Sequence, residues 1–283
     1  MSLMSVLNAL DLPGAVHNPV TGGDINAAYR IDSDRGTYFL KINERIPYEG
    51  LFEREASGLQ ELSANSRFVI PAPLKWGTVQ HEQYLLLEWV QQQPPQNDSW
   101  VLFGKMLAEM HRSVQPYFGY KEDNYLGTWQ QSNNPAPTWQ QFYADFRILP
   151  LVRKLYDDQK LNATDSVRAE NFCKTLADLF PQETPSLLHG DLWSGNRSFT
   201  AAGEPCIFDP AVYYGHREMD IGMTLLFGGF DQQFYQSYQQ LYPLQPGWKQ
   251  RVHFTQLYPL LLHAHLFGGQ YIHRCQAILS SFS

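Results

Sequence analysis

Three polar side chains at fixed intervals constrain the fold of this chain more than any other feature. Asp191 and Asn196 lie five residues apart in the run His-Gly-Asp-Leu-Trp-Ser-Gly-Asn, and Asp209 follows Asn196 by thirteen residues. The stretch between them is strand-like on either side of Ala201–Glu204, which predicts a hairpin. Because a hairpin would return Asp209 to the side of Asn196, the spacing predicts that all three side chains meet in one site.

The residue types at these positions suggest a chemistry. Asp191 can accept a proton from an attacking hydroxyl group. Asn196 offers a neutral amide oxygen and Asp209 a carboxylate, and such hard oxygen ligands suit Mg²⁺. The alternative is a loop in which Asp191 and Asn196 only cap turns, as these residue types commonly do.

A second feature, far away in the sequence, favours the catalytic interpretation. Lys41 lies in a strand-like, mostly apolar and aromatic segment, and Glu55 follows fourteen residues later in a segment with helical periodicity. In protein kinases a strand Lys held by a helix Glu grips the α- and β-phosphates, and the catalytic Asp and the metal-binding Asn and Asp have the spacing seen here. A solvated edge position is the usual alternative for a strand Lys. Glu53 remains a competing partner, because spacing alone does not exclude it.

Gly22 and Gly23 lie between two strand-like runs near the N-terminus. Glycine allows the backbone to approach phosphates closely, so this pair is expected to turn over the nucleotide. The pair matches neither G-x-G-x-x-G nor a Walker loop, and a plain hairpin turn is the alternative.

Several motifs together carry a family resemblance. The matching segments are Gly22–Asn26, Phe39–Asn43, Phe52–Ala56, Leu107–His111, Phe118–Tyr120, Asn124–Gly127, His189–Asn196, Asp209–Ala211, Tyr214–Glu218, Leu226–Phe230 and Leu266–Gly269. With them the chain resembles the fructosamine-3-kinase (ketosamine-3-kinase) family, within the aminoglycoside-phosphotransferase and protein-kinase-like group. One departure is Asp24, where many members have Cys in a Gly-Gly-Cys-Ile-Asn turn.

The resemblance implies a fold and a reaction. The fold would be an α+β, two-lobed protein-kinase-like architecture with an antiparallel-sheet N-lobe and a mostly helical C-lobe. The reaction would transfer phosphate from ATP, with Mg²⁺, to the 3-hydroxyl of a ketosamine on a glycated amine, a deglycation repair step. The adenine of ATP would meet the hinge backbone, which implies groups of Glu88 and Val90.

The periodicity along the chain predicts two regions. Residues 14–90 are strand-rich, and after Asp98 apolar residues recur at helical spacing, as in Trp139, Phe142, Tyr143 and Phe146. We therefore expect a nucleotide-binding lobe over 4–90 and a catalytic and substrate lobe over 91–283, with a hinge near 88–95.

Composition excludes several classes of protein. Hydrophobic residues make up 43% of the chain and charged residues 17%, which indicates a globular protein rather than a disordered one. The net charge of −7 argues against a nucleic-acid surface. No apolar run reaches the ~20 residues that span a bilayer, so no membrane partner is expected. The three cysteines, Cys173, Cys206 and Cys275, are odd in number and have no metal-like spacing, which favours a reducing, cytoplasmic location.

Four other residues are candidates for the site. His189 is expected to orient Asp191 or its loop, and Asp220 to support the loop by accepting backbone N–H bonds. Trp193 is a candidate wall for a sugar, since aromatic rings pack on C–H faces. His263 is a candidate substrate contact, with a core or groove position as the alternative.

These observations predict an ATP-dependent ketosamine kinase that acts on a free or protein-bound substrate. The alternatives are a kinase for an aminoglycoside or amino alcohol and a catalytically silent nucleotide-binding module. The complete set of Lys41, Asp191, Asn196 and Asp209 argues against the silent module, which need not retain all four.

Overall fold

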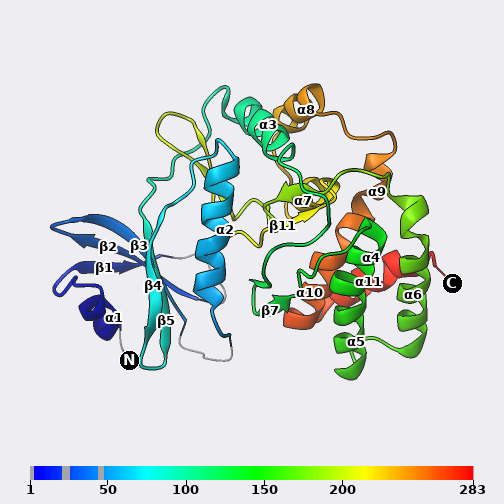
Figure 1. Cartoon of the computed structure of the whole chain (residues 1–283), viewed down its shortest axis with the longest axis horizontal. Coiled ribbons are helices and arrows are strands. Elements are labelled where there is room, and N and C mark those ends of the chain that lie inside the picture. Colours follow the sequence, from blue (N-terminus) through cyan, green and yellow to red (C-terminus); the bar gives the residue numbers. More distant parts are fainter. Residues whose placement is uncertain (1–2, 21–25, 44–47, 283) are drawn as a thin grey trace.

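The N-terminal part of the chain is built on one five-stranded sheet with the order β1-β2-β3-β5-β4 (Figure 1). A computed structural model describes residues 3–20, 26–43 and 48–282 of the chain. The strands are β1 (Val16–Pro19), β2 (Ala27–Ser33), β3 (Gly36–Asn43), β4 (Pro73–Val79) and β5 (Glu82–Glu88). All neighbouring pairs are antiparallel, which confirms the predicted sheet.

A helix covers each face of this sheet. Side chains alternate along a strand, so Leu86 of β5 packs with α1 (Leu3–Ala9), whereas Leu85 and Leu87 pack with α2 (Leu51–Asn65). In β3 the same alternation sends Leu40 toward α1 and the neighbouring Lys41 to the α2 side. The pleat therefore brings a lysine to the helix that carries Glu55.

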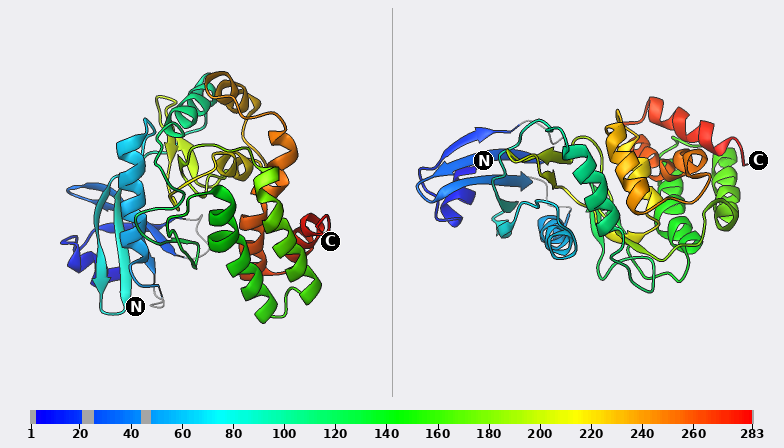
Figure 2. Two further views of the ribbon diagram at one scale, coloured as in Figure 1. Left: turned by 45° about the vertical axis from the view of Figure 1, so that its right-hand side comes forward. Right: turned by 90° about the horizontal axis from the view of Figure 1, so that it is seen from above.

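The C-terminal part is mostly helical. Its helices are α3 (Ser99–Met110), α4 (Trp139–Tyr143), α5 (Leu149–Asp157), α6 (Ala163–Leu179), α7 (Glu218–Thr224), α8 (Gln232–Leu241), α9 (Trp248–Thr255), α10 (Leu257–Phe267) and α11 (Gln270–Leu279). One large apolar cluster holds these helices together. With the sheet-containing N-lobe they form the expected two-lobed, protein-kinase-like fold (Figure 2).

Three two-stranded ladders lie between these helices. They pair β6 (Asn124–Leu126) with β7 (Trp129–Gln131), β8 (Ser186–Leu188) with β11 (Tyr213–Gly215), and β9 (Arg197–Phe199) with β10 (Pro205–Ile207). The third ladder is the hairpin predicted around Ala201–Glu204. Its open end pairs Arg197 with Ile207, so Asn196 lies directly before the first strand and Asp209 two residues after the second.

The aromatic segment is helical and its predicted face is buried, but the helix is not regular throughout. Trp139, Phe142 and Tyr143 are buried in α4, and a π-helical turn, η1 (Ala144–Ile148), then joins α4 to α5. This turn contains Arg147, whose side chain is fully buried. Periodicity does not reveal one wider turn inside a continuing helix.

All three cysteines are buried. None of the helices in the described part of the chain is long and apolar enough to cross a membrane. Gly22 and Gly23 lie outside the described residues.

Candidate active site

The loop that carries Asp191 joins β8 to β9 and is fixed by a buried carboxylate. Asp220, near the start of α7, accepts hydrogen bonds from His189 N at 2.8 Å and Gly190 N at 3.0 Å. The Nε2 atom of His111 lies 3.3 Å from the same carboxylate. His189 accepts from Asp191 N at Nδ1 (3.2 Å) and approaches Phe208 O with Nε2 (3.0 Å). Both His189 and Asp220 therefore hold the backbone on which Asp191 stands.

Glycine is required at the second position of this loop. Gly190 has φ of 82°, a left-handed conformation that side chains rarely adopt. A Cβ atom built on Gly190 would lie 2.1 Å from the carbonyl oxygen of Ala211. The close approach brings the loop against the segment that follows Asp209, where Ala211 N also donates to His189 O at 2.9 Å.

Asp191 and Asn196 are in direct contact. The amide Nδ2 of Asn196 donates to Asp191 Oδ2 and to Asp191 O, both at 2.9 Å. Burial raises the pKa of Asp191 to about 7; the Asn196 hydrogen bond opposes this shift, and the charges of Asp209 and Asp220 add to it. A carboxyl group with such a pKa can exchange protons near neutral pH, as a general base must.

Lys41 connects the two lobes across the cleft. Its Nζ lies 2.7 Å from Glu55 Oε1 and 2.5 Å from Asp209 Oδ1. The partner of Lys41 on α2 is thus Glu55, and not Glu53. Burial disfavours the ammonium ion, but the nearby charges of Asp209 and Glu55 outweigh burial and raise the pKa of Lys41. Lys41 is therefore a fixed cation in this cleft.

The donor set suits magnesium. Asn196 uses Nδ2 in its hydrogen bonds, so its Oδ1 is the atom that can bind a cation, and Asp209 supplies a carboxylate that is 40% exposed. Asp209 has φ of 57°, an uncommon conformation for a residue other than glycine and one that often marks functional sites. No cluster of three or more His, Cys, Asp or Glu side chains with metal-binding geometry occurs among the described residues. One carboxylate with one amide fits an ion that keeps water and substrate phosphates as further ligands.

A cavity of about 640 Å³ opens beside Asp191, Asn196 and Asp209. Trp193 and His263 line it, together with aromatic residues that the sequence analysis did not assign to the site: Tyr125, Phe227, Phe267 and Tyr271. The rings of Trp193 and Phe227 lie 5.7 Å apart, and those of Phe227 and His263 lie 5.0 Å apart. Phe227 and Phe267 begin the two Phe-Gly-Gly runs, so the repeated motif was a signal that could have identified both.

A second cavity of about 310 Å³ continues from Lys41 and Asp209 under the sheet. Glu88 and Val90 line it, as do the apolar side chains of Val20, Ala28, Phe39, Leu87 and Phe208. The two cavities share Lys41, Asn26 and Asp209. A mostly apolar cavity beside a lysine and a carboxylate has the chemistry to accept a nucleotide base whose phosphates point to Lys41.

Residues 11–282 match the sequence profile of the fructosamine kinase family. The chain belongs to this family. It is 40% identical over 284 residues to an Enterococcus faecium protein named "Probable ketoamine kinase", with both chains covered completely. A solved structure of a fructosamine-3-kinase homologue from Thermobifida fusca has a TM-score of 0.85 and 31% identity and covers 99% of both chains. The aminoglycoside phosphotransferase APH(4)-Ia, solved with ADP and hygromycin B, has a TM-score of 0.66 at 14% identity over 99% of both chains, and shows the shared fold.

Membership of the fructosamine kinase family makes the chain a phosphotransferase that acts on a hydroxyl group. ATP use follows from the kinase family. The family is the one that the sequence motifs predicted.

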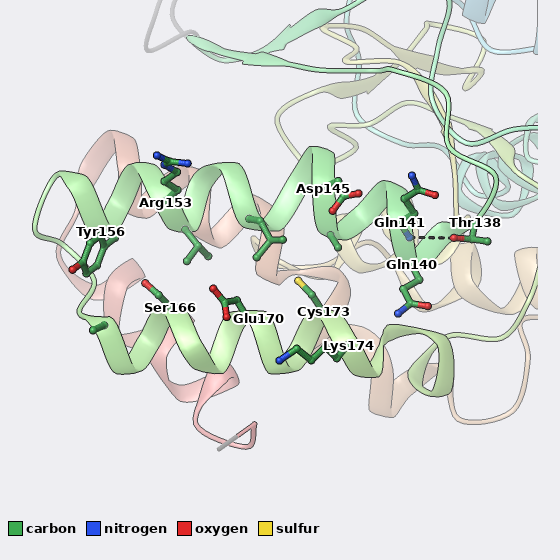
Figure 3. A pocket seen from close by; sticks show the side chains of 14 residues that line it. Thr138, Gln140, Gln141, Asp145, Arg153, Tyr156, Ser166, Glu170, Cys173 and Lys174 are labelled. Atoms are coloured by element: carbon green, nitrogen blue, oxygen red, sulfur yellow. Dashed lines mark hydrogen bonds between the residues drawn. The ribbon is translucent and has the colours of Figure 1, made fainter.

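The described part of this fructosamine kinase family member has another large groove, of about 770 Å³, on the C-terminal lobe (Figure 3). It lies between α4, η1 and α5 on one side and α6 on the other, and Asp145, Glu170 and Cys173 are among the residues that line it. None of the predicted site residues lines this groove. Asp191, Asn196 and Asp209 line the 640 Å³ cavity instead.

Proposed function

We propose that this protein transfers the γ-phosphoryl group of ATP to the 3-hydroxyl of a ketosamine. The observation that carries the proposal is that Lys41, Asp191, Asn196 and Asp209 line one cavity, and that Lys41 and Asp209 also line the second. One cavity suits the base of a nucleotide, and the other has aromatic walls that suit the C–H faces of a sugar. Family membership supports the ketosamine as the acceptor.

In this proposal the residues of the cleft act mainly by positioning. Lys41, paired with Glu55, holds the α- and β-phosphates. Asp191 orients the acceptor hydroxyl and takes its proton as the oxygen attacks phosphorus. Asn196 and Asp209 would hold Mg²⁺, which supplies positive charge to the phosphate oxygens. Because Asp209 binds Lys41 in the structure, we expect ATP binding to exchange this ion pair for contacts with phosphate and metal.

Charge distribution supports a ketosamine over an aminoglycoside. Residues 221–283, which include much of the aromatic wall, contain a single acid, Asp231. A polycationic aminoglycoside would need several carboxylates to replace its hydration. A ketosamine has one amine and several neutral hydroxyls, which aromatic and amide groups can accommodate.

The product chemistry fits a repair role. When a 3-phosphorylated ketosamine loses a proton from C1, a C1–C2 enol that carries the amine nitrogen forms. The nitrogen lone pair can then form the C1=N bond while the C1=C2 pair moves to C2=C3 and the C3–O bond breaks, so that phosphate leaves with the bonding electrons. Water hydrolyses the resulting imine, which frees the original amine and releases the sugar as a 3-deoxy dicarbonyl compound. Phosphorylation at the 3-hydroxyl would therefore supply the leaving group that lets the sugar detach from the amine.

The test is an acceptor panel with Mg-ATP: ribulose-lysine, fructose-lysine, kanamycin and choline. We expect phosphorylation of at least one ketosamine, with the phosphate on O3 by ³¹P–¹H NMR, and little turnover of the other two compounds. Each reaction is paired with the Asp191→Asn variant to exclude a contaminating kinase. Efficient turnover of kanamycin or choline without either ketosamine would reject the substrate and leave the kinase fold unaffected.

A further inference from the structure

The helix that carries Glu55 presents a second polar stripe to the C-terminal lobe. Helix α2 stands between the sheet and this lobe (Figures 1 and 2). Arg54, Ser57 and Glu61 are three and four residues apart, so they lie along one face of the helix. All three contact the loop that precedes β6.

Glu122 is at the centre of these contacts. One carboxylate oxygen of Glu122 accepts a short hydrogen bond from Arg54 Nη1, and the other accepts from Ser57 Oγ at 2.5 Å. A turn further along α2, Glu61 accepts from Tyr120 OH at 2.9 Å and lies 3.5 Å from Lys121 Nζ. The loop thus contacts about two turns of α2, from Arg54, which is next to Glu55, to Glu61.

Close packing accompanies the polar contacts. A Cβ atom on Gly58 would lie 3.3 Å from Val212 and 3.4 Å from Pro210, so α2 touches the segment that follows Asp209. Asn124, two residues after Glu122, donates to Val212 O at 2.7 Å. Movement of α2 would therefore disturb the segment that follows Asp209.

The loop that carries Glu122 is itself anchored to a buried cation. Asn133 binds the loop by donating to Glu122 O at 3.1 Å and to Asp123 Oδ1 at 2.8 Å. Asn133 Oδ1 in turn accepts from Arg147 Nη2 at 2.6 Å. Arg147 is fully buried, and its guanidinium lies 4.5 Å from the ring centre of Tyr213 and 4.6 Å from that of Phe142. A guanidinium buried in this way has few alternative positions. Moving it within the core would break these contacts, and water could not replace them.

We propose that Glu122 is a positioning residue for phosphoryl transfer: through Arg54 and Ser57 it fixes α2, and with it Glu55, against the C-terminal lobe. In protein kinases the placement of the equivalent helix is what activation controls. Here a loop of the same chain supplies that placement permanently. The proposal rests on the proposed role of the Lys41–Glu55 pair in binding ATP.

The decisive variant is Glu122→Ala, and its readout is the affinity for Mg-ATP compared with that for the acceptor. Glu122 does not line the active-site cavity, whereas Arg54 does, so the change at 122 avoids direct substrate effects. If α2 is correctly placed in only a tenth of the molecules, the apparent KM for ATP rises about tenfold. The KM for the acceptor should stay within about twofold, since all of the aromatic wall except Tyr125 lies on elements other than α2 and the Glu122 loop.

Two further variants test the mechanism. Glu122→Gln retains hydrogen bonding without the charge and should give an intermediate KM for ATP. The charge exchange Arg54→Glu with Glu122→Arg should recover part of the loss in affinity for Mg-ATP, which is the readout for this variant because Arg54 lines the acceptor cavity and not the second cavity. Glu109→Gln is the matched control, because Glu109 forms an exposed pair with Arg67 at 3.7 Å and lies on α3. Compared with wild type, the Glu122→Ala protein should show a larger increase in the rate of hydrogen exchange in α2 than in α3.

The failure of this proposal is distinguishable from failure of the proposed function. Calorimetric Kd values for Mg-ATP need no acceptor, so they test Glu122 even if no ketosamine is phosphorylated. Folded Glu122→Ala and Glu122→Gln proteins with wild-type ATP affinity would overturn the positioning role. Equal losses of ATP and acceptor affinity would also overturn it, because they indicate general damage. If Glu122→Ala does not fold, Glu122→Gln decides.

Discussion

The two sides of the cleft hold their functional groups in different ways. On the catalytic side, the loop with Asp191 is bound by near neighbours within the C-terminal lobe, such as Asp220 and Asn196. On the phosphate side, Lys41 depends on Glu55, fourteen positions away, and on Asp209, 168 positions away. In the proposed mechanism the geometry around Asp191 is therefore imposed by one lobe, whereas the lysine proposed to hold the phosphates is in place only when both lobes and α2 are in place.

The apolar cores follow the same division. The C-terminal lobe has one continuous cluster of buried residues, and the N-terminal lobe has two small clusters separated by its sheet. Small separate cores contribute less burial than one large core, because stabilisation scales with apolar area removed from water. We therefore expect changes on the catalytic side to affect chemistry and stability, and changes on the phosphate side to affect mainly ATP affinity.

The largest expected effect is on turnover. Asp191→Asn keeps the size of the side chain but removes the proton acceptor, and should lower kcat by about 10²–10⁴, the usual contribution of a positioned base. The Kd for Mg-ATP should stay near wild type, since Lys41 and Asp209 are unchanged. Steady-state kinetics and calorimetry measure the two quantities. The exposed residue Asp178 provides the control Asp178→Asn, and wild-type turnover in Asp191→Asn would remove Asp191 from the mechanism.

The sequence predicted much of this site because its signals are local. The intervals between Asp191, Asn196 and Asp209 are bridged by one loop and one hairpin, so their meeting follows from short-range pattern. The alternation in β3 likewise places Lys41 toward a helix. The choice between Glu53 and Glu55 was not decidable, because it depends on the rotation of α2 about its axis, which packing against β5 and Glu122 determines.

Contacts between residues that are distant in the sequence could not be predicted from the sequence pattern. The aromatic wall joins Trp193 to residues of the Phe-Gly-Gly runs, which periodicity assigns to helix ends and turns. The burial of Arg147 does not follow from the sequence pattern, because an arginine in an amphipathic segment normally faces water. Only the π-helical turn and the rings around it explain its burial. Expectations for Gly22 and Gly23 stay predictions.

A smaller expected effect is a difference in the free energy of unfolding between a variant on the catalytic side and a variant on the phosphate side. Asp220→Ala leaves the buried N–H groups of His189 and Gly190 without their acceptor, which should lower the free energy of unfolding by about 2–4 kcal/mol. Lys41→Met should lower it less, because burial already raises the pKa of Glu55 and this carboxyl can become neutral. Urea unfolding measures the stabilities, and KM for ATP should respond more strongly to Lys41→Met. A larger stability loss for Lys41→Met would contradict the comparison.

The smallest expected effect is the response of the C-terminal lobe to acid. His111, His189 and His216 are fully buried or nearly so, and burial lowers the pKa of all three. Their contacts fit a neutral ring protonated at Nε2. In His216, for example, Nε2 is 3.2 Å from Pro181 O, and Nδ1 accepts from Glu218 N at 3.4 Å.

The sign of the pH dependence follows from these pKa shifts. Below about pH 6.5 the unfolded chain binds protons that the folded histidines do not, so stability is complete above that pH and falls as pH decreases. Each such histidine contributes a slope of up to about 1.4 kcal/mol per pH unit. Asp191, whose pKa is raised, contributes the opposite slope below about pH 7, so the measurement must compare variants with wild type.

His216→Gln removes one titrating histidine that does not contact Asp191. Glutamine is chosen because its amide can still donate to Pro181 O. Urea unfolding at pH 7.5 and 5.5 should show a smaller loss of stability on acidification in His216→Gln than in wild type. His273→Gln, at an exposed position on α11, should lose as much as wild type. Equal losses in all three proteins would mean that His216 takes up its proton without unfolding. The C-terminal lobe would then tolerate a buried charge beside Glu183 and Glu218, and its compact core would not explain the acid response.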